Sequence, residues 1–137
     1  MQVAIVQMCS SDDLAANLEH ARAGVREAAS RGADLVALPE NFAFMRREGS
    51  PFPCAQEPEG ELVRFLSELA TESGLWLLGG SFPELIPGDS RVYNTSLVFG
   101  PEGQEISRYR KIHLFDVDLG AQSYRESKHF APGTETV

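Results

Sequence analysis

The sequence has few of the residues that mark secreted, metal-binding or membrane proteins. It contains two cysteines, Cys9 and Cys54, and three histidines among 137 residues. Two cysteines do not make the disulfide framework of a small secreted domain, and their spacing does not match a zinc site. No apolar run approaches the length needed to cross a membrane, and the first residues lack the basic-then-apolar pattern of a secretion signal. These absences predict a protein of the reducing cytoplasm.

Positive charge is also scarce. The chain has 12 Lys and Arg residues against 20 Asp and Glu residues, which gives a net charge of -8 at pH 7. Nucleic acids and anionic membranes bind basic surfaces, so we expect neither as a partner. The hydrophobic content of 42% is ordinary for a globular protein, and the length suits one modest domain. We find no internal repeat and no low-complexity segment.

The N-terminal part of the chain has the pattern of a β-α-β unit. Residues 2–8 predict a strand that is apolar on both faces in its middle, which favours a sheet covered on both sides. Ser10 and Ser11 are candidate N-caps for a helix, and an apolar stripe at helical spacing follows over residues 14–28. A second short apolar strand, at 35–38, comes next. Strands joined in this way are parallel, with a right-handed crossover.

The remaining pattern predicts a mixed sheet. We expect a second helix at 59–73, a third strand at 75–78, and a hairpin formed by strands 91–99 and 104–110. The order β-α-β-α-β-β-β implies an α/β fold in which helices cover a face of a mixed β-sheet. The segments expected to be long loops are 41–58 and 120–133.

One carboxylate stands where α/β folds place their chemistry. The apolar run that begins at Leu35 ends at Pro39, which cannot donate to a sheet ladder, and Glu40 follows at once. In open α/β sheets, ligands bind just beyond the carboxyl ends of strands. Glu40 is therefore a candidate functional residue, although a single glutamate at a strand end is more often a solvated turn residue.

Further charges gather at comparable positions. Lys111 directly follows a predicted strand, and if the sheet brings it near Glu40, the carboxylate can exchange protons while the ammonium stabilises an oxyanion. Glu126 adds a third charge in the next loop. Arg46 and Arg47 lie in the long loop after Glu40. They could clamp a substrate carboxylate with their planar forks of donors, although a solvated basic pair is the simpler interpretation.

Six short segments together resemble the nitrilase, or carbon–nitrogen hydrolase, superfamily. In chain order they are Val3-Ala-Ile-Val-Gln-Met8, Leu38-Pro-Glu-Asn-Phe42, Leu78-Gly-Gly-Ser81, Val92-Tyr-Asn-Thr-Ser96, Tyr109-Arg-Lys-Ile-His-Leu-Phe-Asp116, and Glu126-Ser127 with Pro132-Gly133. The resemblance covers essentially the whole chain and is nearest to small amidases that act on α-keto acid amides and on deaminated glutathione. It implies a four-layer α-β-β-α sandwich, of which residues 1–137 would form the N-terminal part of a single domain.

The resemblance also implies roles for the charged residues. The family hydrolyses amides through a cysteine thioester and needs no cofactor. Glu40 would be the general base, Lys111 the oxyanion stabiliser, and Glu126 the carboxylate that positions substrate and lysine. Asn94 matches the family's strand motif and could bind substrate, orient Lys111 or simply pack in the strand. As a complete protein, we expect a homodimer or a larger assembly acting on a small amide.

The family's nucleophile is absent from this chain. In the family that cysteine lies after a further strand, in a Cys-Tyr-Asp-like motif well beyond Glu126, and the sequence ends at Val137 before it. Neither Cys9 nor Cys54 matches the motif, and we expect Cys9 to pack as a small apolar residue. The 137 residues alone are therefore expected to be inactive, and half of a two-sheet sandwich should leave one sheet face uncovered.

Two other interpretations remain open. The missing nucleophile would also suit a non-catalytic pseudo-enzyme domain of the same fold. The second alternative is a metal-dependent phosphoesterase, because such enzymes also place a glutamate at a strand end, and His113 and Asp116 could add ligands. The sequence has no acidic cluster with metal-ligand spacing, so we predict no metal site.

Overall fold

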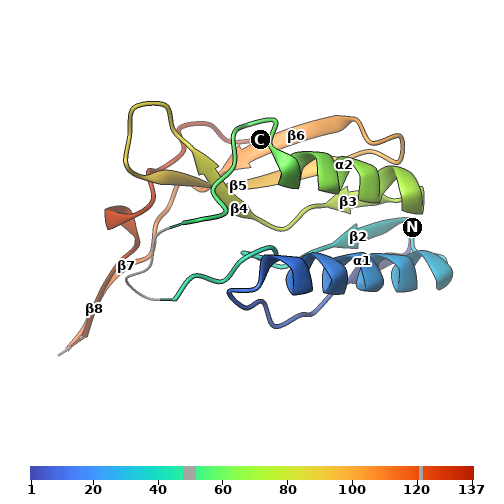
Figure 1. Cartoon of the computed structure of the whole chain (residues 1–137), viewed down its shortest axis with the longest axis horizontal. Coiled ribbons are helices and arrows are strands. Elements are labelled where there is room, and N and C mark those ends of the chain that lie inside the picture. Colours follow the sequence, from blue (N-terminus) through green and yellow to red (C-terminus); the bar gives the residue numbers. More distant parts are fainter. Residues whose placement is uncertain (48–51, 121) are drawn as a thin grey trace.

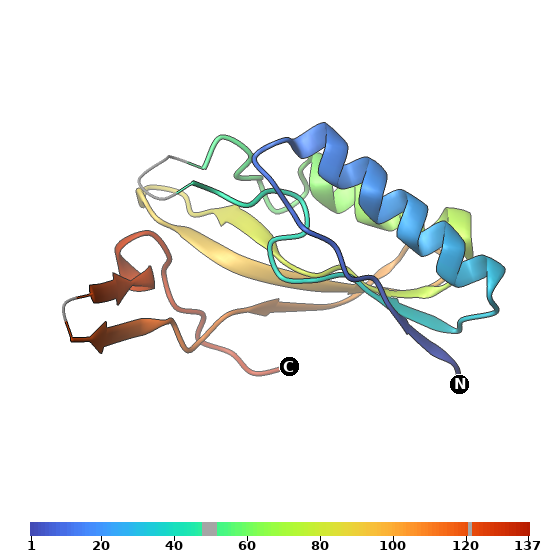
Figure 2. The same ribbon diagram turned by 90° about the horizontal axis from the view of Figure 1, so that it is seen from below.

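A computed structural model describes residues 1–47, 52–120 and 122–137. Within them, six strands form the main sheet, and both helices lie side by side on one of its faces (Figures 1 and 2). None of the described helices is long and apolar enough to cross a membrane. The elements are β1 (Val3–Ile5), α1 (Leu14–Ser30), β2 (Leu35–Ala37), α2 (Glu61–Ser73), β3 (Trp76–Leu78), β4 (Phe82–Leu85), β5 (Val92–Phe99), β6 (Glu105–Arg110), β7 (Asp116–Leu119), β8 (Gln122–Arg125) and the 3-10 helix η1 (Glu126–Lys128).

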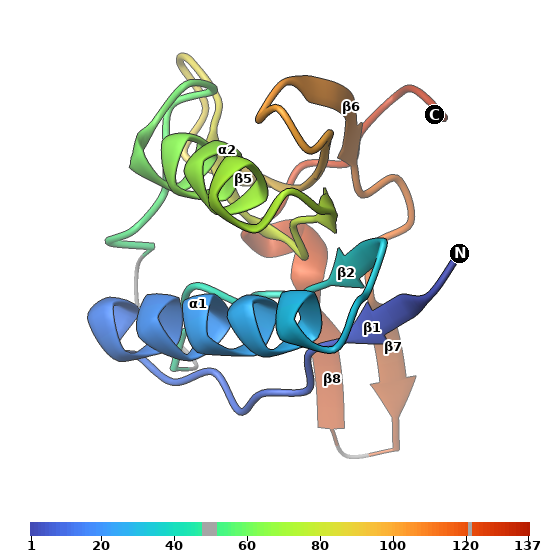
Figure 3. The same cartoon turned by 90° about the vertical axis from the view of Figure 1, so that its right-hand side faces the viewer.

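The pairing of the strands confirms the mixed sheet that the sequence predicts. β1, β2 and β3 run parallel, and their register sets Val3, Leu35 and Trp76 side by side. β5 runs antiparallel to three neighbours, with β3 and β4 following one of its edges and β6 the other. Seen from the end in Figure 3, the helices lie on one side of the sheet.

Helix α1 begins later than either predicted N-cap. Asp13 is the N-cap, and its carboxylate accepts the backbone N–H of Ala16 at 3.0 Å. The buried Asn17, in the first turn, donates its side-chain amide to the carbonyl oxygens of Ser11 and Ala43, each at 2.8 Å. This amide ties the start of the helix to the loop that leaves β2.

The hydrophobic core lies between the helices and the sheet. Val25 of α1 and Leu66 of α2 are fully buried against Val36 and Leu77 of the central strands. Burying one such side chain stabilises a fold by roughly 1.5–3 kcal/mol, so this layer supplies much of the folding free energy.

The other face of the sheet is uncovered within this chain. Val3 and Ile5 of β1 are 50% and 81% exposed, and Trp76 and Leu78 of β3 are 42% and 37% exposed. The strand register places these side chains in two neighbouring rows. Contiguous apolar surface on a sheet is typical of a face that another layer covers.

A glycine in the segment between β3 and β4 leaves room for the turn that carries Glu40. Gly80 has a φ of 59°, in the left-handed region that favours glycine, and a Cβ there would lie 2.1 Å from the carbonyl oxygen of Pro39. The hydroxyl of Ser81 accepts the backbone N–H of Asn41 at 3.0 Å. The turn at Glu40 therefore packs directly against Gly80 and Ser81.

Three strands were not predicted. β4 contains Pro83, which has no N–H for a ladder, and this residue disguised the strand. The backbone around position 83 is nevertheless paired, because the N–H of Gln56 donates to the Pro83 carbonyl at 2.9 Å. β7 and β8 form a separate hairpin that projects from the body (Figure 2); β8 lies in the segment 120–133 that was predicted as a loop, and β7 lies just before it. β7 alternates polar and apolar residues from Asp116 to Leu119, a strand signal that was missed, whereas β8 is mostly exposed and shows no such alternation.

Gly80→Ala should destabilise the full-length protein by about 2 kcal/mol or more, because the new methyl group adds a clash to the left-handed strain. Gly88→Ala is the matched control: Gly88 has a φ of 78° and open space around its Cβ position. It should cost only about 1 kcal/mol. Urea midpoints at an unchanged slope measure both effects. Equal shifts in the two variants would show that Gly80 does not approach Pro39 closely.

Candidate active site

Three charged side chains that the sequence singled out come together beyond the carboxyl ends of the strands. The Nζ of Lys111 lies 3.4 Å from Oε1 of Glu40 and 3.1 Å from Oε1 of Glu126. The fold thus brings Glu40 to a lysine that is 71 positions away in the sequence. One ammonium stands between two carboxylates.

Both backbone polar groups of Lys111 are hydrogen-bonded to neighbouring segments. Its N–H donates to the carbonyl oxygen of Asn94 in β5, and its own carbonyl accepts the N–H of Gly133, both at 2.9 Å. A Cβ at Gly133 would lie 2.1 Å from the carbonyl oxygen of Arg110, so the C-terminal segment passes very close to the end of β6. The backbone at Lys111 is therefore fixed from two neighbouring segments.

Glu126 is fixed at the base of the projecting hairpin. Its Oε2 accepts the backbone N–H of Phe115 at 2.5 Å, while its own N–H donates to the Phe115 carbonyl at 3.2 Å. Next to this exchange, the carboxylate of Asp116 accepts the N–H and the hydroxyl of Ser127, at 3.0 and 2.6 Å. The Ser127 hydrogen bonds hold the pKa of Asp116 below its usual value. These hydrogen bonds join the two ends of the hairpin next to Glu126.

Glu40 extends from its turn toward β5. Its Oε1 accepts a hydrogen bond from Nδ2 of Asn94 at 2.7 Å, in addition to the contact with Lys111. The Glu40 side chain is 57% exposed, whereas Asn94 is 4% exposed. The base candidate is thus open to the pocket and anchored from the buried side.

The charge on Lys111 is favoured by its surroundings. Partial burial works against the ammonium, but the hydrogen bond to Glu126 and the negative charges of Glu40 and Glu126 outweigh it and raise the pKa of Lys111. The side chain therefore stays cationic at neutral pH. A permanent cation can stabilise a developing oxyanion, whereas only the carboxylates can accept a proton.

A pocket of about 810 Å³ opens over these residues. This volume suits a small-molecule ligand. Its other lining residues are Met45, Arg46, Phe115, Ser123, Tyr124, Arg125, Lys128, His129 and Phe130. Those at 123–130 belong to the segment that was predicted as a loop, and no motif or periodicity in the sequence marked them as a pocket wall.

The two arginines of the predicted clamp separate. Arg46 lines the pocket, and its guanidinium lies 4.8 Å from the ring centroid of Phe52. Arg47 is not among the described lining residues, and its Nε pairs with Oδ2 of Asp12 at 2.6 Å. The clamp hypothesis therefore rests on Arg46. Residues 48–51 of the predicted loop lie outside the described residues.

Neither cysteine lines this pocket. Cys54 is buried, and burial raises the pKa of its thiol, which makes it a poor nucleophile. Cys9 is exposed, so the prediction that it packs as a small apolar residue is wrong. The reason is that β1 ends at Ile5, and Cys9 lies in the irregular segment that follows.

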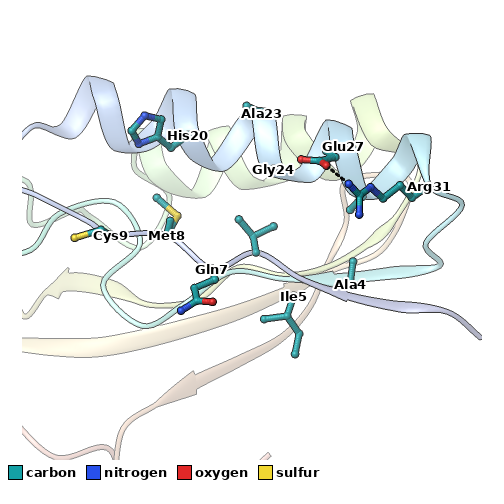
Figure 4. Close-up of a pocket in the computed structure, with 12 residues that line it drawn as sticks. Ala4, Ile5, Gln7, Met8, Cys9, His20, Ala23, Gly24, Glu27 and Arg31 are labelled. Atoms are coloured by element: carbon teal, nitrogen blue, oxygen red, sulfur yellow. Dashed lines mark hydrogen bonds and ion pairs between the residues drawn. The ribbon is translucent and has the colours of Figure 1, made fainter.

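Cys9 lines a second pocket, of about 480 Å³, between β1 and α1 (Figure 4). Met8 and His20 lie nearby, and Glu27 pairs with Arg31 at one end. This pocket holds none of the three clustered charges.

The described residues contain no group of three or more His, Cys, Asp and Glu side chains placed to hold a metal ion. His113 is exposed, and both oxygens of the Asp116 carboxylate accept hydrogen bonds from Ser127. The phosphoesterase interpretation therefore has no ligand set in this part of the chain.

Comparisons with known proteins agree with the fold and the motifs. The model of the carbon-nitrogen hydrolase family matches residues 2–137. The chain is 41% identical over 139 residues to omega-amidase NIT2 of Homo sapiens, covering 96% of this chain and 48% of that protein. It therefore spans about half the length of the curated relatives it matches.

Two solved structures are similar as well. Nit3 of Saccharomyces cerevisiae, a member of the nitrilase superfamily, gives a TM-score of 0.77 at 31% identity and covers 98% of this chain and 49% of its own. The NitFhit protein of C. elegans gives 0.79 at 27% identity, with 98% and 34% covered. Taken with the family match, these likenesses show that the chain belongs to the carbon–nitrogen hydrolase family.

Proposed function

We propose that the protein is an amidase that releases ammonia from a small carboxamide through a cysteine thioester. The observation that carries the proposal is the Lys111 ammonium held between Glu40 and Glu126 inside a pocket of ligand size. The omega-amidase name of the human relative supports the same reaction class. We assign the nucleophilic cysteine to a part of the protein outside residues 1–137.

In the first half of the reaction, Glu40 removes the proton of the thiol, and the sulfur attacks the amide carbon. As the C–S bond forms, the carbonyl π electrons move to oxygen, where Lys111 stabilises the negative charge. Glu40 then gives its proton to the amide nitrogen, the C–N bond breaks, and ammonia leaves. Glu126 keeps Lys111 charged and in place throughout.

In the second half, Glu40 takes a proton from water, and the resulting hydroxide attacks the thioester carbon. The oxygen again becomes negative beside Lys111 until the C–S bond breaks. The proton held by Glu40 returns to the thiolate. The net change is the conversion of amide and water into carboxylic acid and ammonia.

The uncovered face of the sheet supports a proposal about the rest of the protein. The exposed rows that contain Ile5, Trp76 and Leu78 offer an apolar surface for a second sheet. A second sheet on this face would complete a four-layer sandwich. We propose that the remaining part of the protein packs here and supplies the thiol.

Glu40→Gln in the full-length protein should lower kcat for a small carboxamide by about 10³-fold, because an amide oxygen cannot take the thiol proton. KM should change little. Glu19→Gln, at an exposed position of α1, is the control and should keep the wild-type rate. Steady-state release of ammonia measures both, and an unchanged kcat in Glu40→Gln would refute the amidase proposal.

Glu126→Gln should move the alkaline limb of the kcat profile to lower pH. Lys111 must be protonated to stabilise the oxyanion, so activity falls as the pH rises through its pKa, which lies above the ordinary value of 10.5. Removing the charge of Glu126 lowers that pKa, and the fall then comes earlier. Rates between about pH 8 and 11 test this, with the exposed Glu102→Gln as control. Coincident limbs, or a shift to higher pH, would contradict the proposed role of Glu126.

Arg46→Ala should raise KM about tenfold for amides that also carry a carboxylate, since one charge-assisted hydrogen bond is lost. KM for neutral amides should stay nearly the same. Arg47→Ala is the matched control, because Arg47 pairs with Asp12 outside the pocket lining. Equal effects of the two substitutions, or no effect of Arg46→Ala, would remove the carboxylate-binding role.

A further inference from the structure

Asn94 contacts both members of the central charge pair. Its side-chain Nδ2 donates to Oε1 of Glu40 at 2.7 Å, and its main-chain carbonyl accepts the N–H of Lys111 at 2.9 Å. The residue lies inside β5, between β4 and β6, and is 4% exposed. A buried side chain on a central strand has little freedom to turn away, so the amide is a fixed donor.

The two oxygens of Glu40 are consequently unequal. Oε1 accepts from Asn94 at 2.7 Å and lies 3.4 Å from the Lys111 ammonium. Among the described residues, none donates a hydrogen bond to Oε2. An oxygen that already has two donors is the poorer base, because a proton arriving there must displace one of them.

We infer that Asn94 is a positioning residue that makes Oε2 of Glu40 the oxygen that exchanges protons. This inference rests on the proposed function, in which Glu40 is the general base. With the proton on Oε2, the bond from Asn94 to Oε1 persists, so the carboxyl group need not rotate between steps. A neutral donor suits this position, because a cation would weaken the base and a carboxylate would repel it.

The other end of the Asn94 amide indicates that the residue does more than fill space in the strand. Its Oδ1 is buried and has no hydrogen-bond partner among the described residues. An unsatisfied buried acceptor costs free energy, and an apolar side chain would fill the same space without that cost. The amide is therefore useful for what its Nδ2 does, which is to hold Glu40.

The test uses Asn94→Ala and Asn94→Asp in the full-length protein, with kcat and KM measured from about pH 5 to 8. Asn94→Ala should lower kcat about 100-fold at nearly constant KM, because the base is no longer held in line. Asn94→Asp should be at least tenfold slower than Asn94→Ala at neutral pH, since its carboxylate repels Glu40. As the pH falls, the introduced carboxyl gains a proton and can donate, so the Asp-to-Ala rate ratio should rise.

The charged groups around position 94 are Glu40 on the turn after β2 and Lys111 at the end of β6, with Glu126 beyond it. The partner of position 94 on β4 is the uncharged Pro83. Thr95→Val is the matched control. Thr95 is the next residue of β5, is fully buried, and its hydroxyl also lacks a partner among the described residues. Its removal should leave kcat unchanged.

The outcomes separate this inference from the proposed function. A folded Asn94→Ala variant with wild-type kcat, or a loss confined to KM, would overturn the inference even if Glu40→Gln is inactive. An active Glu40→Gln would instead overturn the proposed function. An Asp-to-Ala rate ratio that does not change with pH would show a purely structural role. Melting midpoints check folding, and Asn94→Leu, which has a similar size and no donor, replaces Asn94→Ala with the same expected loss of kcat if the latter is unfolded.

Discussion

The arrangement of the site depends on one cation held between two carboxylates. The Lys111 ammonium lies 3.4 Å from Glu40 and 3.1 Å from Glu126, and all three residues line one pocket. Two negative groups this close to each other would repel without the ammonium, and together they raise the pKa of the ammonium despite its partial burial. The carboxylates therefore favour the charged form of Lys111, and the ammonium offsets the repulsion between them. In the proposed reaction, this lets the lysine stay positive while Glu40 gains and loses a proton.

Much of the fold keeps this cation in place. Below it, the buried Glu84 of β4 pairs with Arg108 at 2.8 Å and with Arg110, the residue before Lys111. A buried carboxylate is tolerated only when paired, so this network holds β6 to β4 across β5. Beside it, Gly133 lets the C-terminal segment bond to the Lys111 carbonyl. The charged site is thus built on strand ends that are fixed by packing and hydrogen bonds.

The sequence predicted those parts of the site that have a local cause. Glu40 follows an apolar strand and a proline, and Lys111 follows another strand. Their strands end at the same edge because β5 runs antiparallel to both β3 and β6, so that β6 runs in the direction of β2. Glu126 was singled out by family resemblance alone. The sequence could not reveal that Asn94 would turn its amide to Glu40, because that contact depends on the register of β5 against a turn 54 residues away.

The failures of prediction also have physical causes. Pro83 concealed β4. The alternation of polar and apolar residues in β7 was missed, and the exposed side chains of β8 left no periodic pattern, so this wall of the pocket was predicted as a loop. Arg46 and Arg47 looked equivalent as neighbours, yet only Arg46 lines the pocket, while Arg47 turns to Asp12. Contacts between distant segments decided each of these cases.

A crystal structure of the full-length protein with its carboxylic acid product tests the central claim most directly. The account predicts a product oxygen within about 3.2 Å of the Lys111 ammonium, and a cysteine sulfur from beyond residue 137 within about 3.5 Å of Oε2 of Glu40. A Lys111 side chain turned to bulk solvent, or a product bound with no thiol beside Glu40, would contradict it.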